Sequence, residues 1–125
     1  MCTDEDQVLE RYIRDWYWDE KSHQFARALG RYLFQFMEHL AQQGLTQRTL
    51  RKHHDNCWCI GSLECQYGDR GEFSPGKVFA YPEANYEILF MHKISDAESA
   101  VASYCTTWRK LYKYTRALGY LDDDA

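Results

Sequence analysis

The hydrophobic positions of this chain recur at steps of three and four residues, which is the period of an amphipathic helix. The clearest stripe runs from Ala97 to Leu118, and Gly119 follows it, where the end of a helix favours glycine. Ser95 and Glu98 stand three residues apart at its start, a spacing that predicts a capping box. We therefore expect a long helix over about residues 97–118. The members of its stripe are Ala97, Val101, Tyr104, Cys105, Trp108, Leu111, Tyr112, Thr115 and Leu118.

Two further stripes lie in the first third of the chain. The longer one predicts a helix that begins after Ser22, a suitable N-cap, and ends before Gly44. The shorter one predicts a helix that begins after Thr3, where three acidic residues suit the positive end of the helix dipole. The members of the longer stripe are Phe25, Leu29, Tyr32, Leu33, Phe36, Met37, Leu40 and Ala41. The members of the shorter one are Val8, Leu9, Tyr12, Ile13, Trp16 and Tyr17.

A third helix is predicted to begin after Thr46. Leu45 and Leu50 occupy the two positions of a hydrophobic staple around that start. The helix is expected to run toward Leu63. Residues 68–76 follow with three glycines and a proline, and this composition predicts a loop.

The stretch 77–94 supports two interpretations. Residues 78–81 are strand-like, and residues 86–91 are apolar at nearly every position, so periodicity alone does not separate strand from helix. Pro82 and Glu83 resemble the first turn of a helix. We favour the helix, and the alternative is a short β-hairpin within 77–92 that turns at residues 82–85.

Together these elements predict a mainly α fold. We expect a single domain over residues 1–125, built as a bundle of four to five helices, with an acidic C-terminal tail at residues 122–125. Hydrophobic residues make up 45% of the chain and aromatic residues 16%, which is ample material for a core. A domain of this size cannot bury every aromatic side chain, so we expect some of them to be left for a partner.

The composition also narrows the cellular setting. No segment has the roughly 18 consecutive apolar residues that a membrane-spanning helix needs, and the N-terminal residues are acidic rather than signal-like. The five cysteines are an odd number without the spacing of a disulfide framework. We therefore expect a soluble cytoplasmic protein with reduced thiols and no membrane partner.

Two segments resemble chemical motifs without completing them. Residues 71–78 match the phosphate-binding pattern G-x-x-x-x-G-K, but Val78 stands where the motif needs a hydroxyl for magnesium. Residues 53–59 hold two histidines and two cysteines, but Cys57 and Cys59 lie about 200° apart around a helix and cannot share one zinc ion. The sequence therefore predicts no cofactor, no metal ligand and no catalytic residue.

Basic residues gather at two places that would suit a phosphate group. Arg48, Arg51 and Lys52 occupy the first turns of the third predicted helix, where backbone amides add a positive field. The second cluster lies on the polar side of the last predicted helix and consists of Arg109, Lys110, Lys113 and Arg116. Lysine and arginine near a helix C-terminus also complement the helix dipole, and this is the structural alternative for the second cluster. If the two clusters lie side by side, they form a phosphate-binding patch.

The order of these elements resembles the core-binding, SAM-like N-terminal domain of tyrosine recombinases and phage integrases. The similar segments are FMEHLAQQG, LTQRTLRKHHDNCWCIG and AVASYCTTWRKLYKYTRALGYL. In that family the domain is a four-helix bundle that clamps DNA. The family's catalytic domain has no counterpart in this sequence, so the resemblance implies DNA binding without recombination. The chain also looks like the small proteins of mobile genetic elements such as integron gene cassettes. By position, the resemblance assigns phosphate contacts to Thr46, Arg48, Thr49, Arg51 and Lys52.

Two classes of function follow from these observations. The first is a non-enzymatic binding module that self-associates as a homodimer and has DNA as its partner. Its DNA-binding residues would be Thr46, Arg48, Thr49, Arg51, Lys52, Arg109, Lys110, Lys113 and Arg116. The second is a small-molecule-binding protein or small enzyme with an aromatic pocket. The tryptophans that would line such a pocket are Trp16, Trp58 and Trp108.

Overall fold

The computed structural model describes residues 4–67, 72–79 and 84–120, and this part of the chain forms six helices with no β-strand. The predicted mainly α class is confirmed, while the count of four to five helices is too low over these residues. None of the described helices has both the length and the apolar content needed to cross a bilayer. The helices are α1 (Asp4–Ile13), α2 (Glu20–Ala41), α3 (Gln47–Tyr67), α4 (Pro75–Val78), α5 (Ala84–Lys93) and α6 (Glu98–Ala117).

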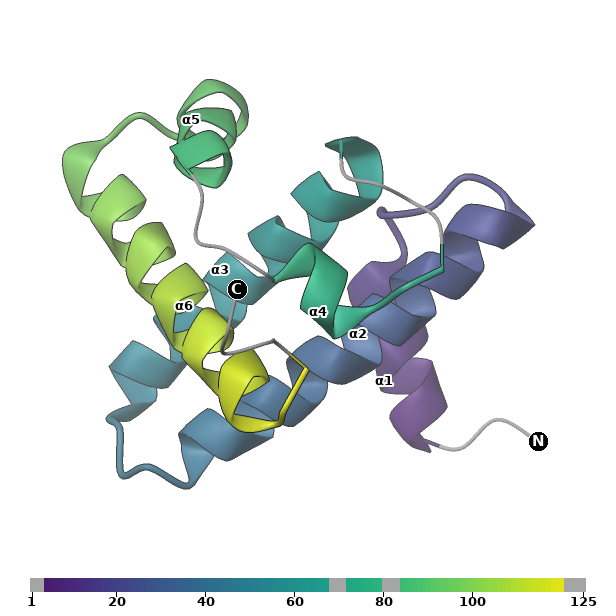
Figure 1. The fold of residues 1–125 in the computed structure, drawn as a ribbon, viewed down its shortest axis with the longest axis horizontal. Helices are drawn as coiled ribbons and strands as arrows, with labels where there is room; N and C mark the ends of the chain where they lie inside the picture. Colours follow the sequence, from purple (N-terminus) through teal and green to yellow (C-terminus); the bar gives the residue numbers. More distant parts are fainter. Residues whose placement is uncertain (1–3, 68–71, 80–83, 121–125) are drawn as a thin grey trace.

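The helices α2 and α3 pack against each other through the middle of the molecule (Figure 1). The short helix α1 packs on α2, and α6 lies across α3 from the opposite side. The helix α5 covers the N-terminal part of α6, where the ring centroids of Phe90 and Tyr104 are 4.1 Å apart. The C-terminal part of α6 contacts α2, where the Tyr32 hydroxyl oxygen lies 2.6 Å from Thr115 Oγ1.

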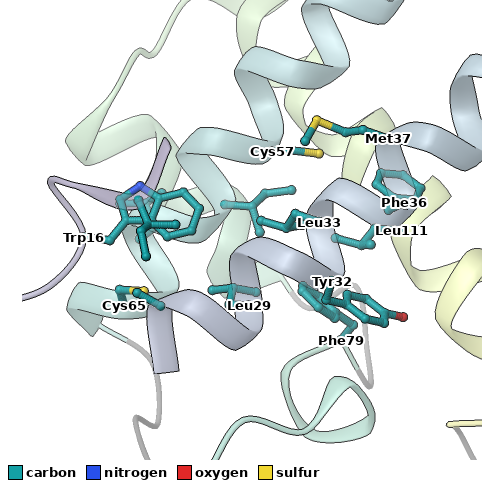
Figure 2. Close-up of a cluster of buried hydrophobic side chains, with 14 of the residues drawn as sticks. Trp16, Leu29, Tyr32, Leu33, Phe36, Met37, Cys57, Cys65, Phe79 and Leu111 are labelled. Carbon is teal, nitrogen blue, oxygen red and sulfur yellow. The ribbon is translucent and has the colours of Figure 1, made fainter. Parts of the chain in front are cut away.

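The centre of the core lies between α2, α3 and α6. Figure 2 shows Leu33, Phe36 and Met37 of α2 grouped with Cys57 of α3 and Leu111 of α6. All of these side chains are buried, so the apolar stripes predicted for α2 and α6 do face the interior. Burial of such stripes supplies most of the stability of helices in a bundle.

Trp16 is the largest fully buried side chain, and it follows α1 in the connection to α2 (Figure 2). Its ring lies directly against the backbone of α3 at Gly61, where a Cβ atom would collide with the indole. A glycine in a helix interior costs about 0.5–1 kcal/mol relative to alanine. Here the close approach of the indole requires it.

The start of α2 differs from the prediction. Asp19, and not Ser22, is the N-cap, and its carboxylate accepts a hydrogen bond of 2.8 Å from the Ser22 backbone N–H. The Ser22 hydroxyl closes a capping box from inside the helix, since it lies 3.1 Å from the Asp19 backbone nitrogen and accepts from it. The predicted end is confirmed, because Gly44 follows α2 with a φ of 74°. The predicted cap of α1, Thr3, lies outside the described residues.

The segment around α4 also differs from the prediction. Residues 75–78 form a single helical turn where a loop followed by a strand-like run was expected. Phe79, at the end of this turn, is buried and stacks on Tyr32 with ring centroids 5.5 Å apart. The apolar run in this segment therefore reflects burial against α2. Residues 86–92 lie in α5, so the hairpin alternative is wrong over the described residues.

The helix α6 extends over nearly the predicted range, but its capping box is absent. Ala97 is the N-cap and makes no side-chain capping bond. The Ser95 hydroxyl accepts a hydrogen bond of 3.2 Å from the Ala97 backbone N–H, which ties it into the turn before the helix. Serine side chains compete for nearby backbone groups in this way, and here the turn wins over the cap.

Candidate nucleic-acid interface

A buried polar contact fixes the crossing of α3 and α6. Thr107 of α6 lies with its Oγ1 2.8 Å from His53 Nδ1, and the Asn56 side-chain amide donates to the same oxygen at 2.9 Å. Asn56 also donates to Ser103 Oγ at 3.1 Å. His53 and Thr107 are both buried, so these bonds satisfy polar groups that would otherwise be costly to bury.

The helices that carry the two predicted basic clusters meet at this crossing. Lys110 lies one turn after Thr107, and Lys52 immediately precedes His53. Burial lowers the pKa of His53, and the positive charge of Lys110 lowers it further. Lys110 and Lys52 therefore belong to the two helix segments that this contact joins.

On α6 the basic residues form one face. At about 100° per residue, the four predicted positions fall within an arc of about 120°. Arg109, Lys113 and Arg116 are exposed, whereas Lys110 is half-buried. Burial raises the pKa values of Tyr86 and Cys105, the negative charge of Glu87 on α5 also raises them, and the positive charge of Arg109 lowers them.

On α3 the basic side chains are exposed and the threonines serve the helix start. Arg48, Arg51 and Lys52 are all exposed. Thr46 Oγ1 accepts a hydrogen bond of 3.2 Å from the Thr49 backbone N–H and lies 3.0 Å from Thr49 Oγ1. The predicted N-cap is thus confirmed. The positive charge of this region comes from the three basic residues, with Asp55 as the exposed acid one turn further along.

A groove of about 290 Å³ lies between the end of α2 and the end of α6. Two of the predicted residues, Lys110 and Lys113, stand on its α6 side. His39 on α2, Gln43 in the turn that follows α2, and Tyr114 on α6 were not predicted. His39 and Tyr114 occupy the edges of their helices, but a helical pattern does not reveal which two edges meet. The residues that line the groove are Phe36, His39, Leu40, Gln43, Lys110, Lys113, Tyr114, Ala117 and Leu118.

A second, larger groove of about 480 Å³ lies on the other side of α2, against α1. Its rim carries Asp4, Glu5, Asp6 and Glu38, and Arg31 forms an ion pair of 3.7 Å with Asp6. An anionic ligand would be repelled by this rim. The smaller groove is therefore the one that suits a phosphate.

The three tryptophans of the alternative function take part in packing. Trp16 is fully buried, and its ring centroid lies 6.4 Å from that of Trp58. The Trp58 indole donates a hydrogen bond of 3.0 Å to the Tyr12 carbonyl oxygen. Trp108 is buried in a different part of the core, stacked on Tyr86 with centroids 4.8 Å apart. None of the three lines either of the two grooves described above.

The cysteine and histidine residues of α3 do not converge. Cys57 is a buried free thiol whose pKa is raised by burial, and Cys59 is half-buried with a pKa that burial also raises. His53 is engaged with Thr107, whereas His54 is exposed. Across the described ranges, no group of three or more histidine, cysteine or acidic side chains is arranged to hold a metal ion.

Comparison with known proteins adds no assignment: no family model, no curated protein and no solved structure matches the chain. The resemblance to recombinase core-binding domains, and the mobile-element setting that it suggests, therefore stay predictions. The basic residues of α3 and α6 and the groove between α2 and α6 are the features on which a function can be argued.

Proposed function

We propose that this chain is a non-enzymatic module that binds the phosphate backbone of DNA with the basic face formed by α3 and α6. The observation that supports the proposal is the buried contact of Thr107 with His53 and Asn56, because it joins the segment of α6 that carries Lys110 to the segment of α3 that carries Lys52. Phosphate contacts from lysine and arginine position a protein on a duplex without reading its sequence.

The distribution of charge supports binding on this side despite a net charge of −4. Arg48, Arg51 and Lys52 on α3 and the four basic residues of α6 supply the positive charge of the proposed face, whereas Asp4 and Glu5 line a groove on the other flank of α2. A local positive field is enough to attract a polyanion over the Debye length of about 8 Å at physiological salt. Asp4 and Glu5 would face away from the DNA.

Fluorescence anisotropy with a labelled 20-base-pair duplex, at 50, 100 and 200 mM NaCl, tests the proposal. We expect affinity to fall steeply with salt, because bound cations release counterions from the duplex. The double variant Lys52→Glu, Lys113→Glu should bind about tenfold more weakly or worse at each salt concentration. Lys21→Glu, an exposed lysine at the start of α2, is the matched control and should bind as the natural chain does. Binding that is absent, or that both variants lower equally, would overturn the proposal.

We also propose that the chain forms a homodimer through the outer face of α5. Ile88, Met91 and Ile94 are each more than two-fifths exposed and follow one another along that helix and its end. Exposed apolar groups of this kind commonly mark protein interfaces. Sedimentation velocity should show a dimer for the natural chain and a monomer for Ile88→Arg, while a natural chain that sediments as a monomer at 50 μM would refute the dimer.

A further inference from the structure

We infer that the groove between α2 and α6 binds one unstacked nucleotide, with its phosphate at Lys110 and Lys113 and its base against His39 and Tyr114. The inference rests on the proposed function and adds to it a preference for unpaired nucleotides. It follows from three properties of the groove: the position of its charges, the aromatic side chains in its wall and its size.

The positive charges lie on one side of the groove. Lys110 and Lys113 both belong to α6, and the described residues that line the groove include no carboxylate. Burial raises the pKa of the Tyr114 hydroxyl most, Tyr120 raises it further, and the carboxylate of Glu38 on α2 also raises it. A phosphate is therefore favoured at the lysines and disfavoured near that hydroxyl. We therefore expect the phosphate end of a nucleotide to enter on the lysine side.

The rest of the lining suits a base. The rings of His39 and Tyr114 have centroids 4.9 Å apart and are tilted by 41°, and Tyr114 also packs on Phe36 at 5.4 Å. Bases stack on aromatic side chains with little dependence on sequence. Gln43 places its side-chain nitrogen 2.9 Å from His39 Nε2, which orients the imidazole. A carboxamide has a second N–H and an oxygen as well, and these groups match the hydrogen-bonding edge of a base.

The size of the groove limits it to one nucleotide. Pockets for drug-sized ligands measure roughly 300–1,000 Å³, and this groove, at about 290 Å³, falls just below that range. A base that is stacked and paired inside a duplex cannot reach such a groove without being extruded, which costs free energy. The chain should therefore favour single strands and unpaired ends over an intact duplex.

Nucleoside phosphates occur free and within a strand, and binding assays can separate these two sources. We would measure the binding of labelled dT12, of a labelled 12-base-pair duplex and of thymidine 5′-monophosphate at one salt concentration. We expect dT12 to bind about fivefold tighter than the duplex or better. If the monophosphate displaces dT12 at micromolar concentration, free nucleotide is a ligand in its own right. If it does not, the strand is the ligand.

The variant His39→Ala tests the groove directly, since His39 is exposed and its loss leaves the core intact. We expect dT12 binding to weaken about fivefold or more and duplex binding to change less than twofold. Gln42→Ala, at the exposed neighbouring position outside the groove, is the control and should change neither. In addition, 2-aminopurine placed in dT12 should lose fluorescence on binding to the natural chain, and should keep it with His39→Ala.

The outcomes separate this inference from the proposed function. Salt-dependent duplex binding together with equal affinity for dT12 would overturn the nucleotide groove and leave the backbone-binding function standing. Equal weakening of dT12 and duplex by His39→Ala would do the same. Binding of the monophosphate without binding of either DNA would uphold the groove and overturn the proposed function.

Discussion

Burial changes the chemistry of single side chains in this protein, and Glu64 is the clearest case. Its carboxyl group lies half-buried on α3, and burial raises its pKa from 4.5 to about 7. Below pH 4.5 the group is protonated in the folded and unfolded chains alike. As the pH rises from 4.5 to 7 the unfolded chain loses this proton first, so the free energy of unfolding falls across that window.

We therefore expect Glu64→Gln to stabilise the fold at pH 8 by about 1–3 kcal/mol and to have little effect at pH 4.5. Urea denaturation of both proteins at the two pH values measures the difference. The control is Glu72→Gln, at an exposed position, which should show the same change in stability at both pH values. A gain for Glu64→Gln that does not depend on pH would contradict the argument.

Thr107 is the second residue on which a prediction can be made, through its hydroxyl group. Thr107→Val keeps the shape of the side chain but leaves His53 and Asn56 without their shared oxygen. Buried polar groups that lose a partner cost about 1–3 kcal/mol. Thr107→Val should lower the free energy of unfolding by that amount, and Thr107→Ser should restore most of it.

Thr106→Val is the matched control for Thr107→Val. Thr106 is exposed, and its hydroxyl donates only to the Ala102 carbonyl oxygen, at 3.0 Å within the same helix. Its loss should change the stability by less than about 0.5 kcal/mol. Equal destabilisation by the two variants would mean that the contact between α3 and α6 does not carry the effect.

At the scale of single elements, the start of α6 offers a position that can be improved. Ala97 is the N-cap, with φ −61° and ψ 129°, and its backbone conformation is compatible with a capping side chain. Ala97→Asp should add a carboxylate that accepts from the first turn of α6 and raise stability by about 1 kcal/mol. Ala102→Asp, at an exposed interior position of the same helix, should not stabilise. Thermal unfolding followed by circular dichroism compares the two.

Elements with one apolar face were predictable from the sequence, and elements without one were not. The helices α2 and α6 carry a continuous stripe that the core buries, so periodicity identified both nearly to their ends. The turn α4 is too short for a period, and Phe79 is buried by its contact with Tyr32, which lies far away in the sequence. The predicted capping roles of Ser22 and Ser95 were wrong, because a serine hydroxyl can bond to backbone groups at several positions of a turn.

The candidate site was predictable to a similar extent. Lys110 and Lys113 follow from their place on the polar side of an amphipathic helix. His39 and Gln43 enter the groove only because the end of α2 lies against the end of α6. That pairing depends on packing between segments distant in sequence, such as the Tyr32 to Thr115 hydrogen bond, and no local pattern encodes it.

At the scale of the whole molecule, the proposed function predicts a definite dependence on salt. Contacts to four to six phosphates would give a slope of about −4 to −5 in a plot of log affinity against log salt concentration. Lys113→Gln should make that slope shallower by about one, because one phosphate contact is lost. Lys21→Gln, on the far end of α2, should leave it unchanged. A slope near zero for the natural chain would refute electrostatic binding.

The acidic groove and the lysine groove described above lie on opposite flanks of α2, so a charged surface acts differently on the two sides of that helix. Asp4 and Glu5 of α1 line the groove on one flank of α2, and Lys110 and Lys113 of α6 line the groove on the other. A long polyanion attracts the second flank and repels the first at the same time. The torque from these opposed forces would turn the protein into a single orientation during diffusion, before any side chain touches its target.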